Sequence, residues 1–145
     1  MTISILLVDD EVAFVESLAK RLTLRQFDVH RAFDAETALR VLADNPTIDV
    51  VVLDVMMPGT DGLTAIKSIK RRHPLVEVIL LSGHANLETS VGGMALGAFD
   101  YLLKPVRLDE LVYKIEDAYR TKTLQEEKIH SLEGVVTPEP NGQDT

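Results

Sequence analysis

The stretch Ile48-Asp49-Val50-Val51-Val52-Leu53 decides the fold class. It is nearly all apolar and rich in β-branched residues, which is typical of a strand buried on both faces of a parallel sheet. Asp54 follows it directly, and a proline and two glycines within residues 56–62 predict a loop after that carboxylate. Open α/β sheets bind ligands at the carboxyl ends of their strands, so this pattern makes Asp54 a candidate functional residue.

The alternation of strand and helix patterns extends outward from this stretch in both directions. Short apolar runs predict four further strands, at residues 3–8, 29–33, 76–81 and 99–103. Apolar residues at three- and four-residue spacing predict a helix after each strand, with faces that begin at Val12, Ala35, Leu63, Leu87 and Leu108. Five strands that alternate with five helices predict an α/β fold with a doubly wound parallel sheet and helices on both faces. For the order of its strands we expect the flavodoxin-like arrangement 2-1-3-4-5.

Two segments depart from this regular pattern. Gly92-Gly93 within the fourth helix predicts that this helix is the least stable, since each glycine costs roughly 1 kcal/mol relative to alanine. Residues 124–132 predict an extension of the last helix, whereas two prolines and two glycines within 134–145 predict disorder. Lys122 and Gln125 interrupt a heptad pattern here, so the evidence for a coiled coil is weak. We therefore expect a domain over 1–120 and a helix extension with a tail or linker over 121–145.

Composition excludes several classes of protein. The 145 residues contain no cysteine, which excludes disulfide scaffolds, cysteine–zinc sites, iron–sulfur clusters and thiol nucleophiles. The 23 acidic residues outnumber the 15 basic ones, and a net charge of -8 disfavours direct binding to nucleic acid. No apolar run is long enough for a membrane span, and the first basic residue is Lys20, which does not fit a signal peptide. We expect a cytoplasmic protein without a membrane partner.

Polar side chains follow four of the predicted strands, and they are Asp9 with Asp10, Asp54, Ser82 and Lys104. In the order 2-1-3-4-5 these four strands are neighbours, so their carboxyl ends are expected to meet in one crevice. Crowded carboxylates raise one another's pKa unless a cation neutralises them, and Mg2+ suits a site of few carboxylates, waters and a phosphoryl group. Asp54, which is central, is the best candidate for a nucleophile that takes up phosphate.

The chain resembles the receiver domain of two-component response regulators, the class of the chemotaxis regulators, in four motifs. These are LLVDDE at 6–11, LDVMMPG at 53–59, LLSGH at 80–84 and YLLKP at 101–105. Each motif alone is weak evidence, but all four occur in order and at the same sheet edge. The resemblance covers residues 1–120, which is the whole predicted fold.

The resemblance implies a role for each residue of the crevice. Asp54 would accept a phosphoryl group from the phosphohistidine of a sensor histidine kinase or a histidine phosphotransfer protein. Asp9 and Asp10 would hold Mg2+ together with Asp54 and the backbone carbonyl of Met56. The Ser82 hydroxyl and the Lys104 ammonium would each bind a phosphoryl oxygen.

The resemblance also implies a switch. Tyr101 would turn its ring inward when Ser82 moves toward the phosphate, and Lys104–Pro105 would be a cis peptide. The fourth helix, fifth strand and fifth helix would then present an altered face to a downstream protein target, to an output domain or to a second copy in a phosphorylation-dependent homodimer. Such a protein catalyses its own phosphorylation and dephosphorylation but is primarily a signalling switch. Met56 and His84 occupy the positions that tune hydrolysis, and apolar Met56 predicts slow dephosphorylation.

Other interpretations remain for single residues. An isolated Asp9 or Asp10 could cap the first helix, Ser82 could be a turn serine, and Lys104 could be a solvated lysine. Tyr101 is nearly as well explained as a core tyrosine. Their joint arrangement favours function.

Two other classes share part of the pattern. A haloacid-dehalogenase-type phosphatase would need an aspartate where Met56 stands, and a flavodoxin-type carrier would not place Asp9-Asp10-Glu11 in its phosphate loop. Two readings of the whole chain stay open: a stand-alone receiver, or the N-terminal receiver segment of a longer regulator whose output domain is absent here.

Overall fold

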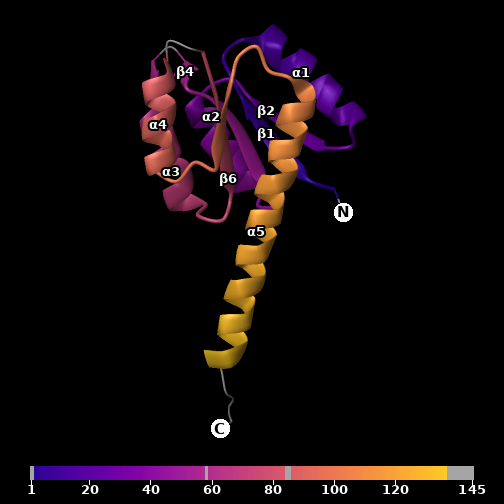
Figure 1. The fold of residues 1–145 in the computed structure, drawn as a ribbon, viewed down its shortest axis with the longest axis vertical. Coiled ribbons are helices and arrows are strands. Elements are labelled where there is room, and N and C mark those ends of the chain that lie inside the picture. Colours follow the sequence, from indigo (N-terminus) through magenta and orange to yellow (C-terminus); the bar gives the residue numbers. More distant parts are fainter. Residues whose placement is uncertain (1, 58, 84–85, 137–145) are drawn as a thin grey trace.

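The computed structural model describes residues 2–57, 59–83 and 86–136. Its main sheet has five parallel strands in the order β2-β1-β3-β6-β7, which is the predicted order 2-1-3-4-5 (Figure 1). The prediction of a flavodoxin-like α/β fold is therefore confirmed. The strands are β1 (Ser4–Val8), β2 (Asp28–Ala32), β3 (Val50–Asp54), β6 (Glu77–Ser82) and β7 (Asp100–Leu103).

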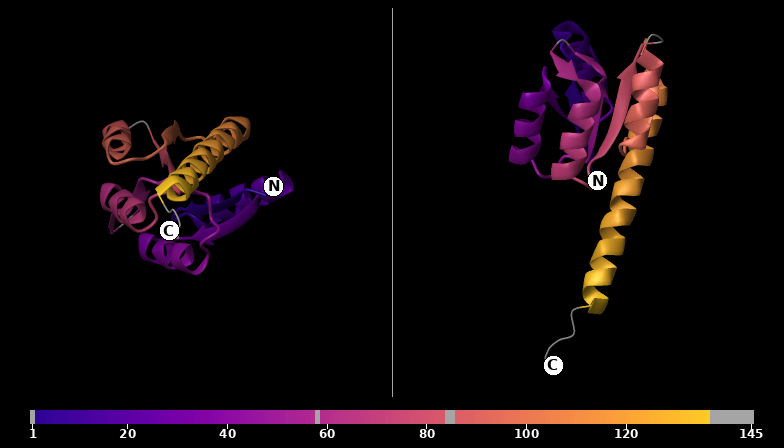
Figure 2. Two further views of the ribbon diagram at one scale, coloured as in Figure 1. Left: turned by 90° about the horizontal axis from the view of Figure 1, so that it is seen from below. Right: turned by 90° about the vertical axis from the view of Figure 1, so that its left-hand side faces the viewer.

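Helices cover both faces of this sheet (Figure 2). The α1 and α5 side chains share one core layer, and the α2 and α3 side chains share the other. The helices are α1 (Val12–Leu24), α2 (Ala35–Asp44), α3 (Gly62–Arg72), α4 (Leu87–Ala95) and α5 (Leu108–Val136).

The central strand β3 is buried on both faces, as its composition predicts. Successive side chains of a strand point to opposite faces. Val50 and Val52 accordingly pack with α1 and α5, whereas Val51 and Leu53 pack with α2 and α3. The apolar side chains thus hold β3 firmly between two layers, and its last residue, Asp54, is fixed at the carboxyl edge of the sheet.

The segment after Asp54 differs from the predicted loop. It contains a short antiparallel pair, β4 (Met56–Met57) with β5 (Thr60–Asp61), and Gly59 between them has a φ of 74°. Asp61 is the N-cap of α3, because its carboxylate accepts a hydrogen bond from the Leu63 N–H at 3.0 Å. Strands of two residues are too short to produce a periodic sequence pattern. The loop prediction was therefore wrong only in that it missed this short pair of strands.

One of the two glycines of α4 has a packing role. A Cβ atom on Gly93 would lie 2.5 Å from the Leu80 Cδ1 and 2.8 Å from the Ile66 Cδ1. The missing side chain therefore lets α4 approach β6 closely. The predicted low stability of α4 stays a prediction.

The helix α5 runs for 29 residues and projects well beyond the sheet (Figures 1 and 2). Its length confirms the predicted extension over residues 124–132, and residues 134–136 are helical where the sequence predicts disorder. The rest of the predicted disordered tail, 137–145, lies outside the described residues. Within the described part of the chain, no helix combines the length and the apolar character needed to cross a membrane.

Candidate functional site

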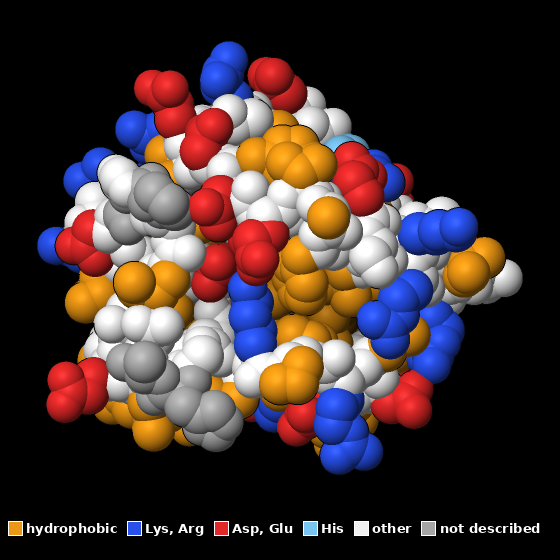
Figure 3. Space-filling view, turned by 90° about the horizontal axis from the view of Figure 1, so that it is seen from above, with side chains coloured by type: hydrophobic (Ala, Val, Ile, Leu, Met, Phe, Trp, Pro, Cys, Tyr) orange, Lys and Arg blue, Asp and Glu red, His pale blue; other side chains and the backbone are white. Residues whose placement is uncertain are grey.

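Four strand ends bring the predicted residues to one edge of the sheet. Asp9 follows β1, Asp54 ends β3, and Lys104 follows β7. Carboxylate oxygens of Asp9, Asp10 and Asp54 lie within 4.8 Å of one another. Acidic side chains accordingly gather at the centre of this face, next to a basic one (Figure 3). Asp9, Asp10, Asp54 and Lys104 thus lie together as predicted, whereas the Ser82 side chain, the fifth one expected here, does not join them.

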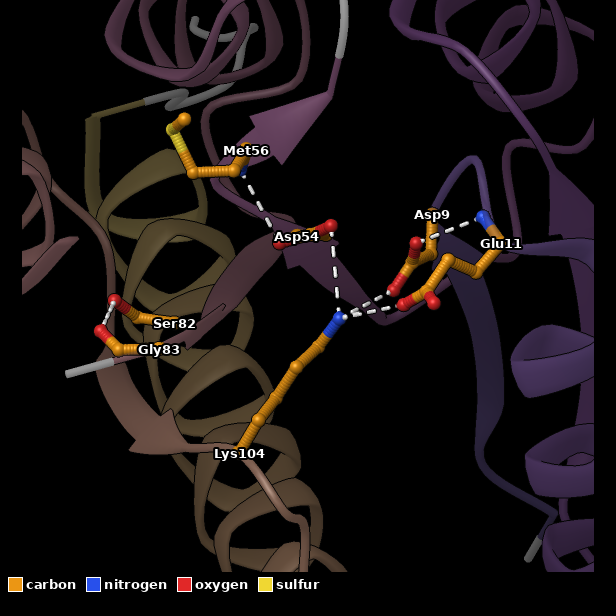
Figure 4. A network of polar contacts seen from close by, with 7 residues as sticks. All are labelled: Asp9, Glu11, Asp54, Met56, Ser82, Gly83 and Lys104. Atoms are coloured by element: carbon orange, nitrogen blue, oxygen red, sulfur yellow. Dashed lines mark hydrogen bonds and ion pairs between the residues drawn. The ribbon is translucent and has the colours of Figure 1, made fainter. Parts of the chain in front are cut away.

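The Lys104 ammonium lies among these carboxylates (Figure 4). Its Nζ donates to Asp9 Oδ2 at 3.0 Å and lies 3.6 Å from Asp54 Oδ2 and 3.5 Å from Glu11 Oε1. Burial disfavours the charged amine, but the hydrogen bond to Asp9 and the nearby negative charges outweigh this effect and raise the pKa of Lys104 above its ordinary value. Lys104 is therefore positively charged at neutral pH.

The Asp54 carboxyl has an unusually high pKa for an aspartate. Burial raises the pKa to about 6, and the charge of Asp9 adds to this effect. The Met56 N–H, which donates to Asp54 Oδ1 at 3.2 Å, and the charge of Lys104 act in the opposite direction without cancelling it. The negative charge at this edge is thus incompletely neutralised by the protein's own groups, and a further cation would stabilise it.

The carboxylate of Asp9 does not cap the first helix. Glu11 is the N-cap residue of α1, and Asp9 Oδ1 accepts a hydrogen bond from the Glu11 N–H at 3.0 Å. This contact leaves Asp9 Oδ2 directed at Lys104. The local turn therefore orients Asp9 toward the crevice, in support of the functional interpretation over the structural one.

The residues fit a divalent cation. Octahedral Mg2+ has ligands at about 2.1 Å, so opposite ligand atoms lie about 4.2 Å apart. Three carboxylates whose oxygens lie within 4.8 Å of one another come close to this spacing, and two of them, Asp9 and Asp54, are buried. Carboxylate oxygens are the donors that Mg2+ prefers. The Met56 carbonyl as a further ligand stays a prediction.

The Ser82 side chain lies apart from the carboxylates in this structure. Its Oγ donates to the Gly83 carbonyl oxygen at 3.0 Å, although Ser82 ends β6, the strand beside β3 (Figure 4). The Ser82 side chain is fully buried. Its predicted contact with a phosphoryl oxygen therefore requires the hydroxyl to rotate away from Gly83.

The remaining predicted residues have different outcomes. Tyr101 is half-buried and packs against the core layer of α2 and α3, and the Lys104–Pro105 peptide is cis as predicted. The side chain of Met56 is largely exposed, whereas its backbone N–H binds Asp54. His84 lies outside the described residues. The switch role of Tyr101 and the hydrolysis-tuning roles of Met56 and His84 stay predictions.

The structure adds two contacts of Lys104 that the sequence analysis missed. One is Glu11, which ends the LLVDDE motif, and the other is Phe14, whose ring centroid lies 4.7 Å from Lys104 Nζ. Both residues belong to the start of α1. The only sequence signal for them was their place within four residues of Asp10, at the start of the helix nearest the crevice.

A second buried polar network lies at the opposite end of β3. Asp49 Oδ2 accepts a hydrogen bond from the Ser4 N–H at 2.9 Å, and Asp49 Oδ1 lies 3.1 Å from Lys122 Nζ. Lys122 also donates to Glu126 at 2.8 Å. Burial lowers the pKa of Lys122, but the hydrogen bonds to Glu126 and Asp49 outweigh burial. The pKa of Lys122 is therefore above its ordinary value. This network joins α5 to the central strand.

Sequence comparison identifies the class of protein that this fold and site define. The profile of the family described as the response regulator receiver domain matches residues 5–116. The chain belongs to this family, and it is a receiver domain of two-component signal transduction.

Individual relatives are longer regulators. The chain is 37% identical over 134 residues to the regulatory protein AtoC of Escherichia coli, a match that covers 92% of this chain and 29% of AtoC. It is 36% identical over 136 residues to a putative response regulator NtrX-like protein of Rickettsia felis, with 92% and 28% coverage. The chain thus spans less than a third of the length of these curated relatives.

Solved structures show the same fold. A response regulator receiver domain protein from Clostridium thermocellum superposes with a TM-score of 0.81 at 34% identity, over 85% of this chain and 98% of the other. NtrX from Brucella abortus in complex with ADP superposes with a TM-score of 0.82 at 37% identity, over 88% of this chain and 29% of NtrX.

Proposed function

We propose that this receiver domain accepts a phosphoryl group on Asp54. The observation that carries the proposal is the position of the Asp54 carboxylate. It lies buried at the end of the central strand, beside two further aspartates and the Lys104 ammonium. An aspartate carboxylate is an established covalent nucleophile for phosphate.

The chemistry requires little beyond positioning and charge. A carboxylate oxygen of Asp54 forms a bond to phosphorus while the bond from phosphorus to the donor nitrogen of a phosphohistidine breaks. The electron pair of that bond stays on the imidazole nitrogen, which takes up a proton from solvent, so that the ring leaves as neutral imidazole. Asp9, Asp10, Asp54 and the Met56 carbonyl would hold Mg2+, which when bound neutralises charge on the phosphoryl oxygens.

The polar side chains around Asp54 would hold the product. Lys104 Nζ is already 3.6 Å from Asp54 Oδ2, so a short movement of its side chain would bring it to a phosphoryl oxygen. The Ser82 hydroxyl would rotate from Gly83 to a second phosphoryl oxygen. This rotation would open space for the half-buried Tyr101 ring to turn inward, and the surface of α4, β7 and α5 would change with it.

The partners follow from this role. A sensor histidine kinase or a histidine phosphotransfer protein would supply the phosphoryl group in the cytoplasm. The altered surface would contact a downstream protein, an output domain or a second copy of the chain. The length of relatives such as AtoC supports the reading of this chain as the N-terminal receiver of a longer regulator, with a receiver over 1–120 and an extension over 121–145.

Mass spectrometry tests the proposal. Incubation with Mg2+ and acetyl phosphate should add about 80 Da, the mass of one phosphoryl group, to the wild-type chain. The Asp54→Ala variant should take up no such mass, and chelation of Mg2+ should prevent uptake by the wild type. Asp44→Ala, which removes an exposed carboxylate at the end of α2, is the matched control and should be modified normally. An adduct that persists in Asp54→Ala overturns the assignment.

The lifetime of the adduct tests the role of Met56. Because a thioether gives an attacking water no strong hydrogen bond, the phosphoryl group should persist for minutes or longer after the donor is removed. Loss of the adduct within seconds would contradict this expectation.

A further inference from the structure

The Lys104 ammonium has partners of two kinds. Asp9 and Asp54 are proposed metal ligands, and their oxygens lie 3.0 and 3.6 Å from Lys104 Nζ. Glu11 and Phe14, at the start of α1, belong to neither the proposed metal site nor the phosphoacceptor, and they contact the same ammonium. An apolar hollow lies beside the acidic and basic side chains of this face (Figure 3).

The two kinds of partner differ in what a bound cation does to them. A divalent cation bound to Asp9 and Asp54 neutralises the same carboxylate charges that attract the Lys104 ammonium, so this attraction weakens when the metal site is filled. The Phe14 ring is not a ligand for Mg2+, so its attraction for the ammonium persists when the metal site is filled. Glu11 also persists, but its carboxylate is 67% exposed and is therefore well screened by water.

The Lys104 side chain needs such a restraint. Its backbone N–H donates to the Ser82 carbonyl oxygen at 2.8 Å, which fixes the start of the side chain at the sheet edge. The four-carbon stem beyond it is flexible. The Phe14 ring, by contrast, is half-buried and packs against the core layer of α1 and α5. A rigid aromatic face thus lies 4.7 Å from a mobile charge that has to meet a phosphoryl oxygen.

We propose that Phe14 is a positioning residue for Lys104, whose ammonium the face of the ring keeps beside Asp54 while Mg2+ occupies the carboxylates. This inference rests on the proposed phosphorylation of Asp54. The attraction between a cation and an aromatic face accounts for the restraint, and tyrosine provides it as well as phenylalanine does. An aliphatic side chain of similar size does not.

The first measurement is the rate constant for modification of Asp54 by acetyl phosphate at saturating Mg2+. Phe14→Leu should lower it about two- to fivefold, which corresponds to the strength of an exposed cation–aromatic contact. Phe14→Tyr should retain the wild-type rate constant. Phe99→Leu removes the same ring atoms from a half-buried phenylalanine of the same core layer and should leave the rate constant unchanged.

The second measurement does not depend on phosphorylation. In the Mg2+-loaded protein, the Lys104 ε-CH2 protons should resonate upfield in NMR spectra because they lie near the ring face. The upfield shift should disappear in Phe14→Leu and remain in Phe14→Tyr and Phe99→Leu. Lys104→Arg assigns the signal. If Phe14→Leu does not fold, Phe14→Met replaces it in both measurements with the same expectation.

The outcomes separate this inference from the function on which it rests. If the wild-type chain takes up no phosphoryl group, the proposed function fails. If the wild type is modified on Asp54 and Phe14→Leu reacts at the same rate with an unchanged Lys104 signal, only the role of Phe14 is overturned. Equal losses in Phe14→Leu and Phe99→Leu would likewise overturn it, because they would show a general effect of core packing.

Discussion

The two ends of the central strand β3 carry similar residues in different states. We call the amino-terminal end of β3 the lower end and its carboxyl end the upper end. At the lower end, Asp49 directly precedes β3 and pairs with Lys122 of α5. At the upper end, Asp54 ends β3 and lies near Lys104, which precedes α5 in the chain. Each aspartate is buried, and each faces one lysine.

The difference is in how completely each aspartate is satisfied. At the lower end, each Asp49 oxygen has a close partner, the Ser4 N–H at 2.9 Å and Lys122 at 3.1 Å. At the upper end, Asp54 shares the more distant Lys104 with Asp9 and Glu11. Burial raises the pKa of Asp54 to about 6. Removal of one partner of a satisfied buried pair destabilises a fold, whereas an excess of buried negative charge is free to bind a cation.

The largest expected effect comes from exchanging the two lysines for methionine in turn. Lys104→Met removes the cation that meets the developing phosphoryl charge, and we expect phosphorylation by acetyl phosphate to slow by about 100-fold. Lys122→Met removes a cation at the far end of β3, so its rate constant should remain within about twofold of wild type under conditions where the variant is folded. Equal slowing in the two variants would contradict the division of roles between the ends of β3.

The second effect concerns stability. Lys122→Met leaves the Asp49 carboxylate buried beside a neutral side chain, and we expect a loss of about 3 kcal/mol in the free energy of unfolding. Urea denaturation at neutral pH measures this loss. Lys128→Met, on the exposed extension of α5, makes the same chemical change and should alter stability by less than about 0.5 kcal/mol. If the two variants are equally stable, the lower network does not anchor α5.

The third effect is a pH dependence that belongs to the upper end. Because the pKa of Asp54 is raised from 3.8 to about 6 in the folded chain, the folded state binds the proton more tightly than the unfolded state. Stability without Mg2+ should therefore fall as the pH rises through this window. In Asp54→Asn this loss is absent, so the variant should exceed the wild type by on the order of 2 kcal/mol at pH 7 and match it near pH 4.

Denaturation of both proteins across this pH range measures the difference directly. The free-energy gap at pH 7 should shrink when Mg2+ is added, since the cation stabilises only the charged wild-type site. A gap that does not change with pH would show that Asp54 titrates normally in the folded chain.

The sequence predicted the upper end of β3 and missed the lower end. Asp9, Asp54 and Lys104 were predictable because each follows an apolar strand run, and the ends of neighbouring parallel strands meet at one edge. Asp49 stood out only as a single polar residue in an apolar run, and Lys122 only as an interruption of a heptad pattern. Their contact depends on the angle at which α5 crosses the sheet, which residue periodicity does not encode.

The same distinction applies within the fold as a whole. The strands, the helices and the cover of helices on both faces follow from regular spacing over many residues, which is why they were predicted. The β4–β5 pair and the rotation of Ser82 toward Gly83 depend on a few local contacts instead. Phe14 had no place in the predicted site, because its contact with Lys104 depends on the direction of one flexible side chain.

The smallest expected effect comes from Glu11. It tests whether the reactivity of the upper end depends on the burial of the carboxylates near Lys104 or only on their number. Glu11 adds a carboxylate 3.5 Å from Lys104, but its side chain is 67% exposed, and such pairs contribute between zero and about 1 kcal/mol. Glu11→Gln should therefore change the phosphorylation rate constant by less than about threefold, and added salt should remove even this change. Glu16, which lies on α1, forms an exposed pair with Arg31 of β2, and Glu16→Gln is the matched control. A tenfold effect specific to Glu11 would mean that Lys104 responds to every nearby carboxylate. Buried Asp9 and Asp54 alone would then not account for the reactivity of the upper end.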